Sequence, residues 1–175
     1  QTFRAAEIVN GLLNFSRING SEFKDLDINR LIRDCLALLG HQLNVNHITV
    51  VSRFDQSLPL VYGNVGKLQQ VFINIIINAE YFMVEAHGKG KLTIATERTD
   101  DTVKISFTDD GPGIPDDIIG HLFDPFFTTK EVGKGTGLGL SICHGIVTEH
   151  GGKISVESHR KRAIYTQLSL KFFYF

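Results

Sequence analysis

The chain has 175 residues, of which 42% are hydrophobic and 21% are charged. This is the composition of an ordinary soluble domain with enough apolar side chains for one sizeable core. The formal net charge of −1 argues against a nucleic-acid-binding surface, which would normally carry a basic excess. We therefore expect one main soluble domain and no nucleic acid partner.

The sequence contains no apolar run of the roughly 20 residues that a membrane span needs, and the apolar run 71–79 is interrupted by two asparagines. We therefore expect a cytoplasmic chain without membrane contact. Cys35 and Cys143 lie in helical patterns and lack metal-ligand spacing, which predicts buried free thiols in a reducing compartment. Because a helical pattern is already present at the first residue, we expect a piece of a longer protein, with a sensor or a membrane anchor upstream.

The N-terminal segment has the pattern of a helix that packs against a partner helix. Its apolar side chains recur every three or four residues, at Ala5, Ile8, Leu12 and Phe15. The pattern breaks at the Asn-Gly-Ser sequence of residues 19–21. We predict a domain boundary here, with a helical segment at 1–20 and the main domain at 21–175.

The main domain alternates between strand and helix patterns. Strands are predicted at 24–28, 48–54, 92–97, 103–108, 153–158 and 164–170. Helices are predicted at 29–45 with Asn29 as the N-cap, at 64–86, and at 137–150. This order predicts an α/β fold, a sandwich with the helices on one face of a mixed sheet.

Asn74 and Asn78 interrupt the apolar pattern of the helix predicted at 64–86. They lie one turn apart on the same face of that helix. Burying an unpaired amide costs about 1–3 kcal/mol, so both side chains need partners. Amide oxygens are hard ligands that suit magnesium.

Two glycine-containing segments follow, Asp109-Asp-Gly-Pro-Gly113 and Gly133-Lys-Gly-Thr-Gly-Leu-Gly139. Glycines leave backbone amides open to polyphosphate, so ATP with magnesium would satisfy both the asparagines and the glycines. Spacing excludes a P-loop, because no Gly-x-x-x-x-Gly-Lys-Ser/Thr sequence occurs. It also argues against a dinucleotide fold, whose glycines follow the first strand.

Together these motifs resemble the catalytic, ATP-binding domain of two-component sensor histidine kinases, in the superfamily that includes gyrase and the large heat-shock chaperone. The motifs are Asn-x-x-x-Asn-Ala at 74–79, Asp-Asp-Gly-Pro-Gly-Ile-Pro at 109–115, Phe-Asp-Pro-Phe-Phe-Thr-Thr-Lys at 123–130, and the glycine-rich sequence at 133–140. The resemblance covers residues 24–158, and residues 1–17 resemble the second helix of the family's dimerisation hairpin. It implies a Bergerat fold.

The resemblance also implies an activity and its partners. Such a kinase transfers the γ-phosphate of ATP to a histidine on its own dimerisation hairpin, works as a homodimer in the full-length protein, and signals to a response regulator. None of the seven histidines here is followed by an acidic residue, as the family's phosphoacceptor is. We therefore expect the acceptor on the missing first helix of the hairpin, and no autophosphorylation by this chain alone.

Residue roles follow from the same resemblance. Asn78 is expected to bind magnesium, and Asp109 to accept the exocyclic amine of adenine in a charge-assisted bond worth about 1.5–3 kcal/mol. Residues 131–136 are expected to form a mobile lid without nucleotide. Further nucleotide contacts are implied for Phe82, Gly111, Gly113, Ile114, Lys130, Gly135, Thr136, Gly137, Leu138 and Gly139, the last three through amides at a helix N-terminus.

Asn74 bears on the subclass. The superfamily's hydrolases carry a glutamate at this position, which activates water as a general base. Asparagine cannot accept a proton, so this residue favours a kinase over a clamp-type ATPase.

Three features depart from the family pattern. Tyr81 and Phe82 either line the ribose or pack inside the domain. Residues 160–164 read Arg-Lys-Arg-Ala-Ile, where the family shows Gly-x-Gly-Thr, and the chain ends in four aromatic residues at 172–175. Two other interpretations stay open: a clamp-type ATPase, and a pseudokinase module that binds no nucleotide.

Overall fold

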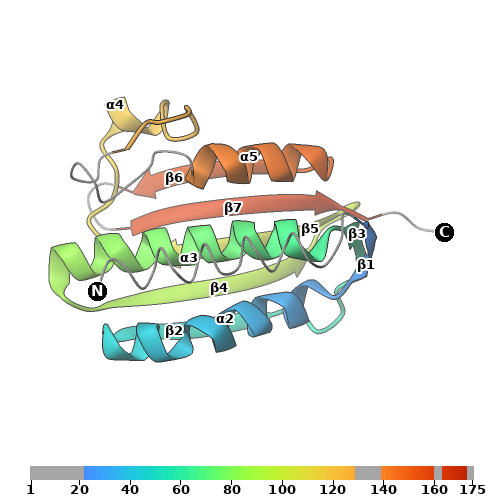
Figure 1. Ribbon diagram of the computed structural model, residues 1–175, viewed down its shortest axis with the longest axis horizontal. Helices are drawn as coiled ribbons and strands as arrows, with labels where there is room; N and C mark the ends of the chain where they lie inside the picture. Colours follow the sequence, from blue (N-terminus) through green and yellow to red (C-terminus); the bar gives the residue numbers. More distant parts are fainter. Residues whose placement is uncertain (1–21, 129–138, 160–162, 173–175) are drawn as a thin grey trace.

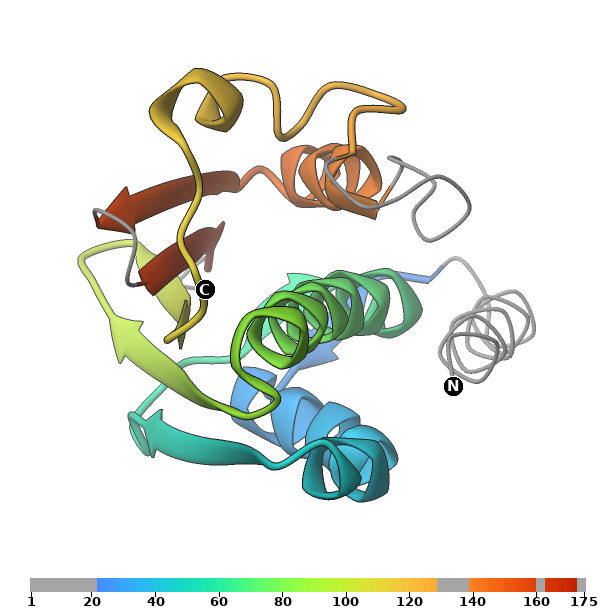
Figure 2. The same cartoon turned by 90° about the vertical axis from the view of Figure 1, so that its left-hand side faces the viewer.

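The computed structural model describes residues 22–128, 139–159 and 163–172. These residues form a two-layer α/β sandwich, with a mixed sheet in one layer and helices in the other (Figure 2). The predicted fold class is therefore confirmed. The helix predicted at 1–20, and with it the boundary near residue 20, lies outside the described residues.

The main sheet has five strands and mixed direction (Figure 1). The first pair in its spatial order is parallel and the others are antiparallel. Buried Val103, Ile105 and Phe107 alternate with half-buried residues, the period-two pattern of a strand with one covered face. The order is β2 (Ile48–Phe54), β4 (Gly90–Arg98), β5 (Thr102–Asp109), β7 (Ala163–Lys171) and β6 (Lys153–His159).

Helix α2 (Ile28–Val45) is capped by Asp27, whose carboxylate accepts the N–H of Arg30 at 3.1 Å. The prediction of Asn29 as the cap is therefore wrong, and the strand predicted at 24–28 is two residues shorter than expected. Asn29 is buried in the first turn: its amide donates to the Asp55 carbonyl and accepts from the Thr96 hydroxyl, both at 2.8 Å. Its side chain is needed between the helix and the sheet, so it cannot cap the helix.

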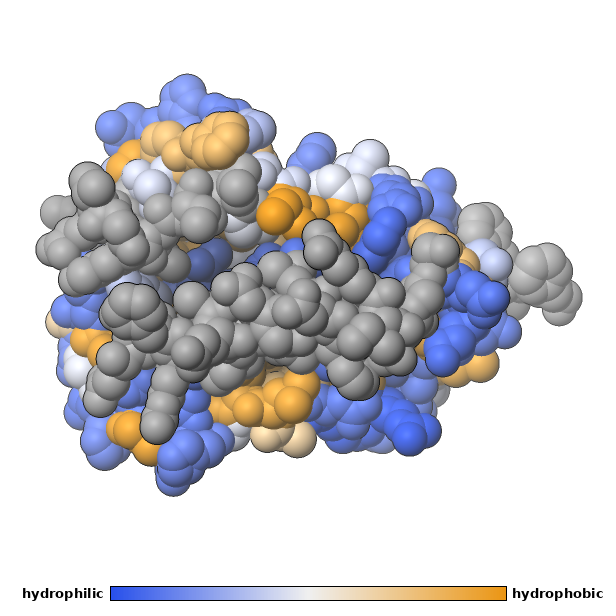
Figure 3. Space-filling view, viewed as in Figure 1, coloured by the Kyte–Doolittle hydropathy of each residue, from blue (hydrophilic) through white to orange (hydrophobic). Residues whose placement is uncertain are grey.

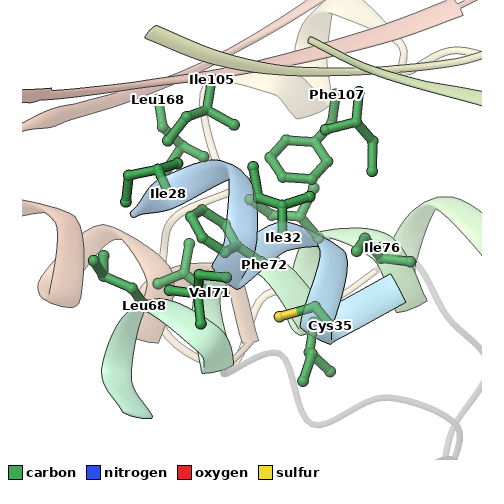
Figure 4. Close-up of a cluster of buried hydrophobic side chains, with 14 of the residues drawn as sticks. Ile28, Ile32, Cys35, Leu68, Val71, Phe72, Ile76, Ile105, Phe107 and Leu168 are labelled. Carbon is green, nitrogen blue, oxygen red and sulfur yellow. The ribbon is translucent and has the colours of Figure 1, made fainter. Parts of the chain in front are cut away.

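Helix α3 (Val65–His87) runs through the middle of the helix layer. The side chain of Asn64 accepts the N–H of Lys67 at 3.0 Å, and Gly88 ends the helix in the left-handed conformation that glycine adopts most readily. The helix predicted at 64–86 is thus confirmed to within a residue or two. In the core, the ring of Phe72 packs 6.1 Å from that of Phe107 on the sheet (Figure 4).

The remaining elements are short or lie near the glycine-rich region. Strand β1 (Lys24–Leu26) pairs with β3 (Val61–Gly63), and α4 (Asp116–Ile119) follows Pro115. Neither β3 nor α4 was predicted, because elements this short carry too few residues for a reliable periodic pattern. Helix α5 (Gly139–Glu149) agrees with the helix predicted at 137–150 over the described residues.

Two predictions from composition can be compared with the structure. Cys35 and Cys143 are both free and fully buried, as predicted. No helix in the described ranges combines the length and apolar character that crossing a bilayer would require.

Candidate functional site

Asp109, the last residue of β5, is an ionisable side chain only 5% exposed. Burial raises the pKa of its carboxyl to about 6, although the backbone amides of Gly111 and Ile164 favour the ionised form. The Gly111 N–H donates to the Asp109 Oδ1 atom at 2.9 Å. A buried carboxyl with a raised pKa at a strand end is typical of a ligand-binding site.

The two glycines after Asp109 fit the limited space and the backbone conformation found there. A Cβ on Gly111 would lie 2.9 Å from Asp109 Oδ1 and 3.5 Å from Met83 Cγ of α3, so any larger residue would press on the acid. Gly113 has a φ of 77°, a conformation that favours glycine. Nucleotide contacts were predicted for both glycines, and the structure shows that an added Cβ at Gly111 would instead crowd the carboxyl of Asp109.

Two side chains anchor the loop that follows β5. The N–H of Ile114 donates to Ser158 Oγ at 2.8 Å, at the far end of β6, and Asp110 accepts the N–H of Lys91 at 2.8 Å. Neither anchor was predicted. Ser158 lies 44 residues from Ile114 in the sequence, so no local pattern could have pointed to it.

Asn74 and Asn78 both lie half-buried on α3. The Nδ2 atom of Asn74 donates to Cys143 Sγ on α5 at 3.8 Å, so Asn74 lies at the contact between the two helices. In the described ranges, no three His, Cys, Asp or Glu side chains gather into a metal cluster. A hard amide oxygen such as that of Asn78 fits a magnesium ion that takes its other ligands from phosphates and water.

Tyr81 and Phe82 lie about one turn beyond Asn78. Their rings pack edge to face, with centroids 5.1 Å apart, and both residues are half-buried. The two aromatic residues therefore contact each other, and the contact of Phe82 with a nucleotide stays a prediction.

Among the described residues, helix α5 begins at Gly139, where an added Cβ would meet none of their atoms within 4 Å. Just before the glycine-rich region, the ring of Phe123 packs 5.6 Å from that of His144 on α5. The remaining predicted contacts, Lys130, Gly135, Thr136, Gly137 and Leu138, lie outside the described residues, as does the lid predicted at 131–136.

Two parts of the site lie at the left of Figure 1: the C-terminal half of α3, which carries Asn78, and the segment that leaves β5 toward α4. Helix α5 begins nearer the middle of the molecule and contacts Asn74 of α3. A separate open hollow of about 620 Å³ lies along the edge strand β2 and contains none of the predicted nucleotide residues. It is lined by Arg33, Ser52, Arg53, Phe54, Asp55, Gln56 and Thr96.

Comparison with known proteins identifies the family. Residues 63–172 match the family described as histidine kinase-, DNA gyrase B-, and HSP90-like ATPase. The chain is 33% identical over 163 residues to sporulation kinase A of Bacillus subtilis (strain 168), an alignment that covers 93% of this chain and 26% of that protein. The chain thus spans about a quarter of the length of this curated relative.

Solved structures agree. The nucleotide-free catalytic domain of histidine kinase ThkA has a TM-score of 0.75 and 34% identity, over 86% of this chain and 95% of that one. ThkA in complex with the response regulator TrrA has a TM-score of 0.71 and 31% identity, over 96% of this chain and 47% of that one. The chain belongs to the histidine kinase-, DNA gyrase B- and HSP90-like ATPase family and, within it, is the ATP-binding domain of a two-component sensor histidine kinase.

Proposed function

We propose that this domain binds ATP with magnesium and transfers the γ-phosphate to a histidine on a dimerisation hairpin. In that step the histidine nitrogen bonds to the γ-phosphorus, the bond from phosphorus to the β,γ-bridging oxygen breaks, and ADP leaves. Magnesium, when bound, neutralises phosphate charge. The observation that carries the proposal is that Asn74, which contacts α5, and Asn78, one turn further along α3, are amides that cannot act as a general base.

In this proposal the chain's own residues divide the work of holding ATP. Asp109 accepts the exocyclic amine of adenine in its ionised form, within a loop that Ser158 and Gly111 keep in place. Asn78 offers its amide oxygen to the magnesium that the phosphates carry. The first turn of α5 directs backbone amides and the positive end of the helix dipole toward the phosphates.

The two acids of α3 argue against a clamp-type ATPase. Glu80 is buried, and its carboxylate accepts from Gln42 Nε2 at 2.6 Å and from Asn46 Nδ2, both at the C-terminal end of α2. Its oxygens are therefore directed away from α5. Glu85 is exposed and lies roughly 10 Å along the helix beyond Asn78. Neither is placed to activate a water molecule beside Asn74, as hydrolysis would require.

The proposed partners follow the relatives. ThkA binds a response regulator in its solved complex, and we extend that partner class to this domain. The hairpin comes from the resemblance of residues 1–17 to its second helix, and implies a homodimer in the full-length protein.

The test mixes the chain with ATP, magnesium and a second polypeptide that carries a complete dimerisation hairpin. Acid-labile phosphate should form on the histidine of the second polypeptide, whereas the chain alone should bind ATP without labelling itself or releasing phosphate. Robust phosphate release by the chain alone, abolished in Asn78→Ala, would favour the clamp ATPase. Calorimetry that detects no ATP binding would instead favour the pseudokinase module.

A further inference from the structure

Two buried cysteines flank α3 from different helices. Cys35 of α2 and Cys143 of α5 are both 0% exposed, and each thiol donates a weak hydrogen bond to a backbone carbonyl of α3. Cys35 Sγ lies 4.0 Å from the Gln69 oxygen, and Cys143 Sγ lies 3.9 Å from the Val71 oxygen. Figure 4 shows the sulfur of Cys35 pointing toward the part of α3 that carries Val71.

The two thiols differ in one respect. Among the hydrogen bonds of the described residues, only that between Asn74 Nδ2 and Cys143 Sγ, at 3.8 Å, joins a thiol to a side chain of the site. Burial raises the pKa of the Cys143 thiol to about 12, so it keeps its proton at neutral pH. The S–H can donate to the Val71 carbonyl while a sulfur lone pair accepts from Asn74.

This contact sets the orientation of the Asn74 amide. A carboxamide is planar, so fixing Nδ2 against sulfur also fixes the position of Oδ1. Asn74 is half-buried and lies one helical turn before Asn78, on the same face of α3. Cys143 lies one turn after Gly139, so the same contact links the amide to the first turn of α5, where phosphates are expected.

We propose that Cys143 is a positioning residue for phosphoryl transfer, which holds the amide of Asn74 in one orientation and couples it to the start of α5. This rests on the proposed kinase function. Cys143 itself is buried beneath the site and touches no phosphate. Its effect should therefore appear in the rate of transfer rather than in adenine binding, which depends on Asp109 at the end of β5.

The test compares three single variants in transfer to the hairpin polypeptide. Cys143→Val keeps a buried apolar side chain but removes the acceptor, and should lower kcat about tenfold while the Kd for ATP changes less than about twofold. Cys143→Ser retains an acceptor and a donor, and should keep kcat within about threefold of the unmodified chain. Cys35→Val is the matched control, because it removes the other buried thiol, and should leave kcat unchanged.

A double-mutant cycle separates positioning from packing. In an Asn74→Ala background, Cys143→Val should lower kcat no further, because the group that it positions is already missing. An equal loss of kcat in Cys35→Val, or a further tenfold loss in the double variant, would overturn the proposal.

A readout without nucleotide keeps this proposal distinct from the kinase assignment. The side-chain amide resonances of Asn74, observed by NMR, should shift in Cys143→Val and stay in place in Cys35→Val. Unmoved resonances in Cys143→Val would show that the thiol does not fix the amide. An unmodified chain that fails to phosphorylate the hairpin removes the proposed function and the catalytic role of Cys143 with it, while these resonances still report on the contact.

Discussion

The two ends of the proposed nucleotide site are built differently. The adenine end lies where β5 leaves the sheet, and its groups are held by hydrogen bonds to backbone amides, such as Gly111 N–H to Asp109 and Ile114 N–H to Ser158. The phosphate end lies between α3 and α5, and there Asn74 is held by a long contact to a sulfur atom. The first group of contacts ties the loop to β5 and β6 of the sheet, whereas two packed helices can slide past each other.

The helix layer, which contains the phosphate end, also exposes apolar side chains. Figure 3 shows hydrophobic surface on the helix layer, on both sides of the atoms drawn in grey. The exposed large apolar side chains of the helices include Leu38 and Val45 on α2 and Ile142 on α5. The proposed adenine end is thus held at the end of a strand, while the proposed phosphate end belongs to a layer that exposes apolar side chains. We expect variants of the two ends to separate affinity from rate.

The largest effect on affinity should come from Asp109→Asn. The variant loses the charge in a charge-assisted bond to adenine, so the Kd for ATP should rise by about ten- to a hundredfold in calorimetry. The control is Asp110→Asn, which alters an exposed neighbour whose carboxylate accepts the N–H of Lys91. It should change the Kd less than about threefold, and equal affinities for Asp109→Asn and the unmodified chain would exclude Asp109 as the base reader.

The same carboxyl predicts a pH dependence. Its pKa of about 6 means that the form able to accept from adenine is mostly present at neutral pH and scarce near pH 5. The affinity for ATP should therefore fall about tenfold between about pH 7.5 and pH 5. In Asp109→Asn the dependence should reduce to the titration of ATP itself, and a parallel fall in both proteins would mean that another group titrates.

The free energy of unfolding should change with the opposite sign. The pKa of Asp109 is higher in the folded chain than its ordinary value of 3.8, so protonation stabilises the fold. This contribution is fully present below about pH 4 and is lost as the pH rises through about 6. Without nucleotide, Asp109→Asn should thus gain stability relative to the unmodified chain as the pH is raised from about 4 to 7.

Local patterns predicted most of the fold. The strand at 48–54 was predicted to the residue, because alternation and flanking turn residues act over a few positions. The misplaced cap at Asn29 has the opposite cause, since the partners of that side chain, Asp55 and Thr96, lie far along the chain.

The same contrast between local patterns and distant contacts applies to the residues of the site. The types and order of Asn74, Asn78 and Asp109 in the sequence indicated a nucleotide, because the chemistry of the ligand restricts those residue types. The residues that hold them were not predictable, because their partners are remote. Cys143 looked like any buried thiol in a helix, and no local pattern pointed to the contacts of Glu80 with Gln42 and Asn46.

A smaller effect should follow from loosening α5 at its far end. His150 accepts the N–H of Asn64 through Nε2 at 3.0 Å, and its Nδ1 lies 2.7 Å from the Ile146 carbonyl. Phe23 packs on the ring at 4.8 Å between centroids. His150→Ala should cost about 1–2 kcal/mol of unfolding free energy and raise the Kd for ATP about threefold, since α5 contributes the phosphate end.

Adenosine separates the two ends in this variant. It lacks phosphates, so its affinity should be the same in His150→Ala and in the unmodified chain. The control is His41→Ala, which removes an exposed histidine of α2. A matching loss of adenosine and ATP affinity would mean that α5 supports both the adenine end and the phosphate end of the site.

The smallest effect on function is expected for Glu80→Gln, although it alters a buried acid on α3. The carboxylate accepts from Gln42 and Asn46, so the variant should lose stability through weaker hydrogen bonds, by about 1–2 kcal/mol in chemical denaturation. Because these partners direct Glu80 toward α2, the rate of transfer to the hairpin should stay within about twofold of the unmodified chain, and neither protein should release phosphate on its own. A fall of about tenfold or more in the rate of transfer, with ATP affinity retained, would identify Glu80 as a general base after all. The phosphate end would then contain a carboxylate able to activate water, as the site of a clamp-type ATPase does.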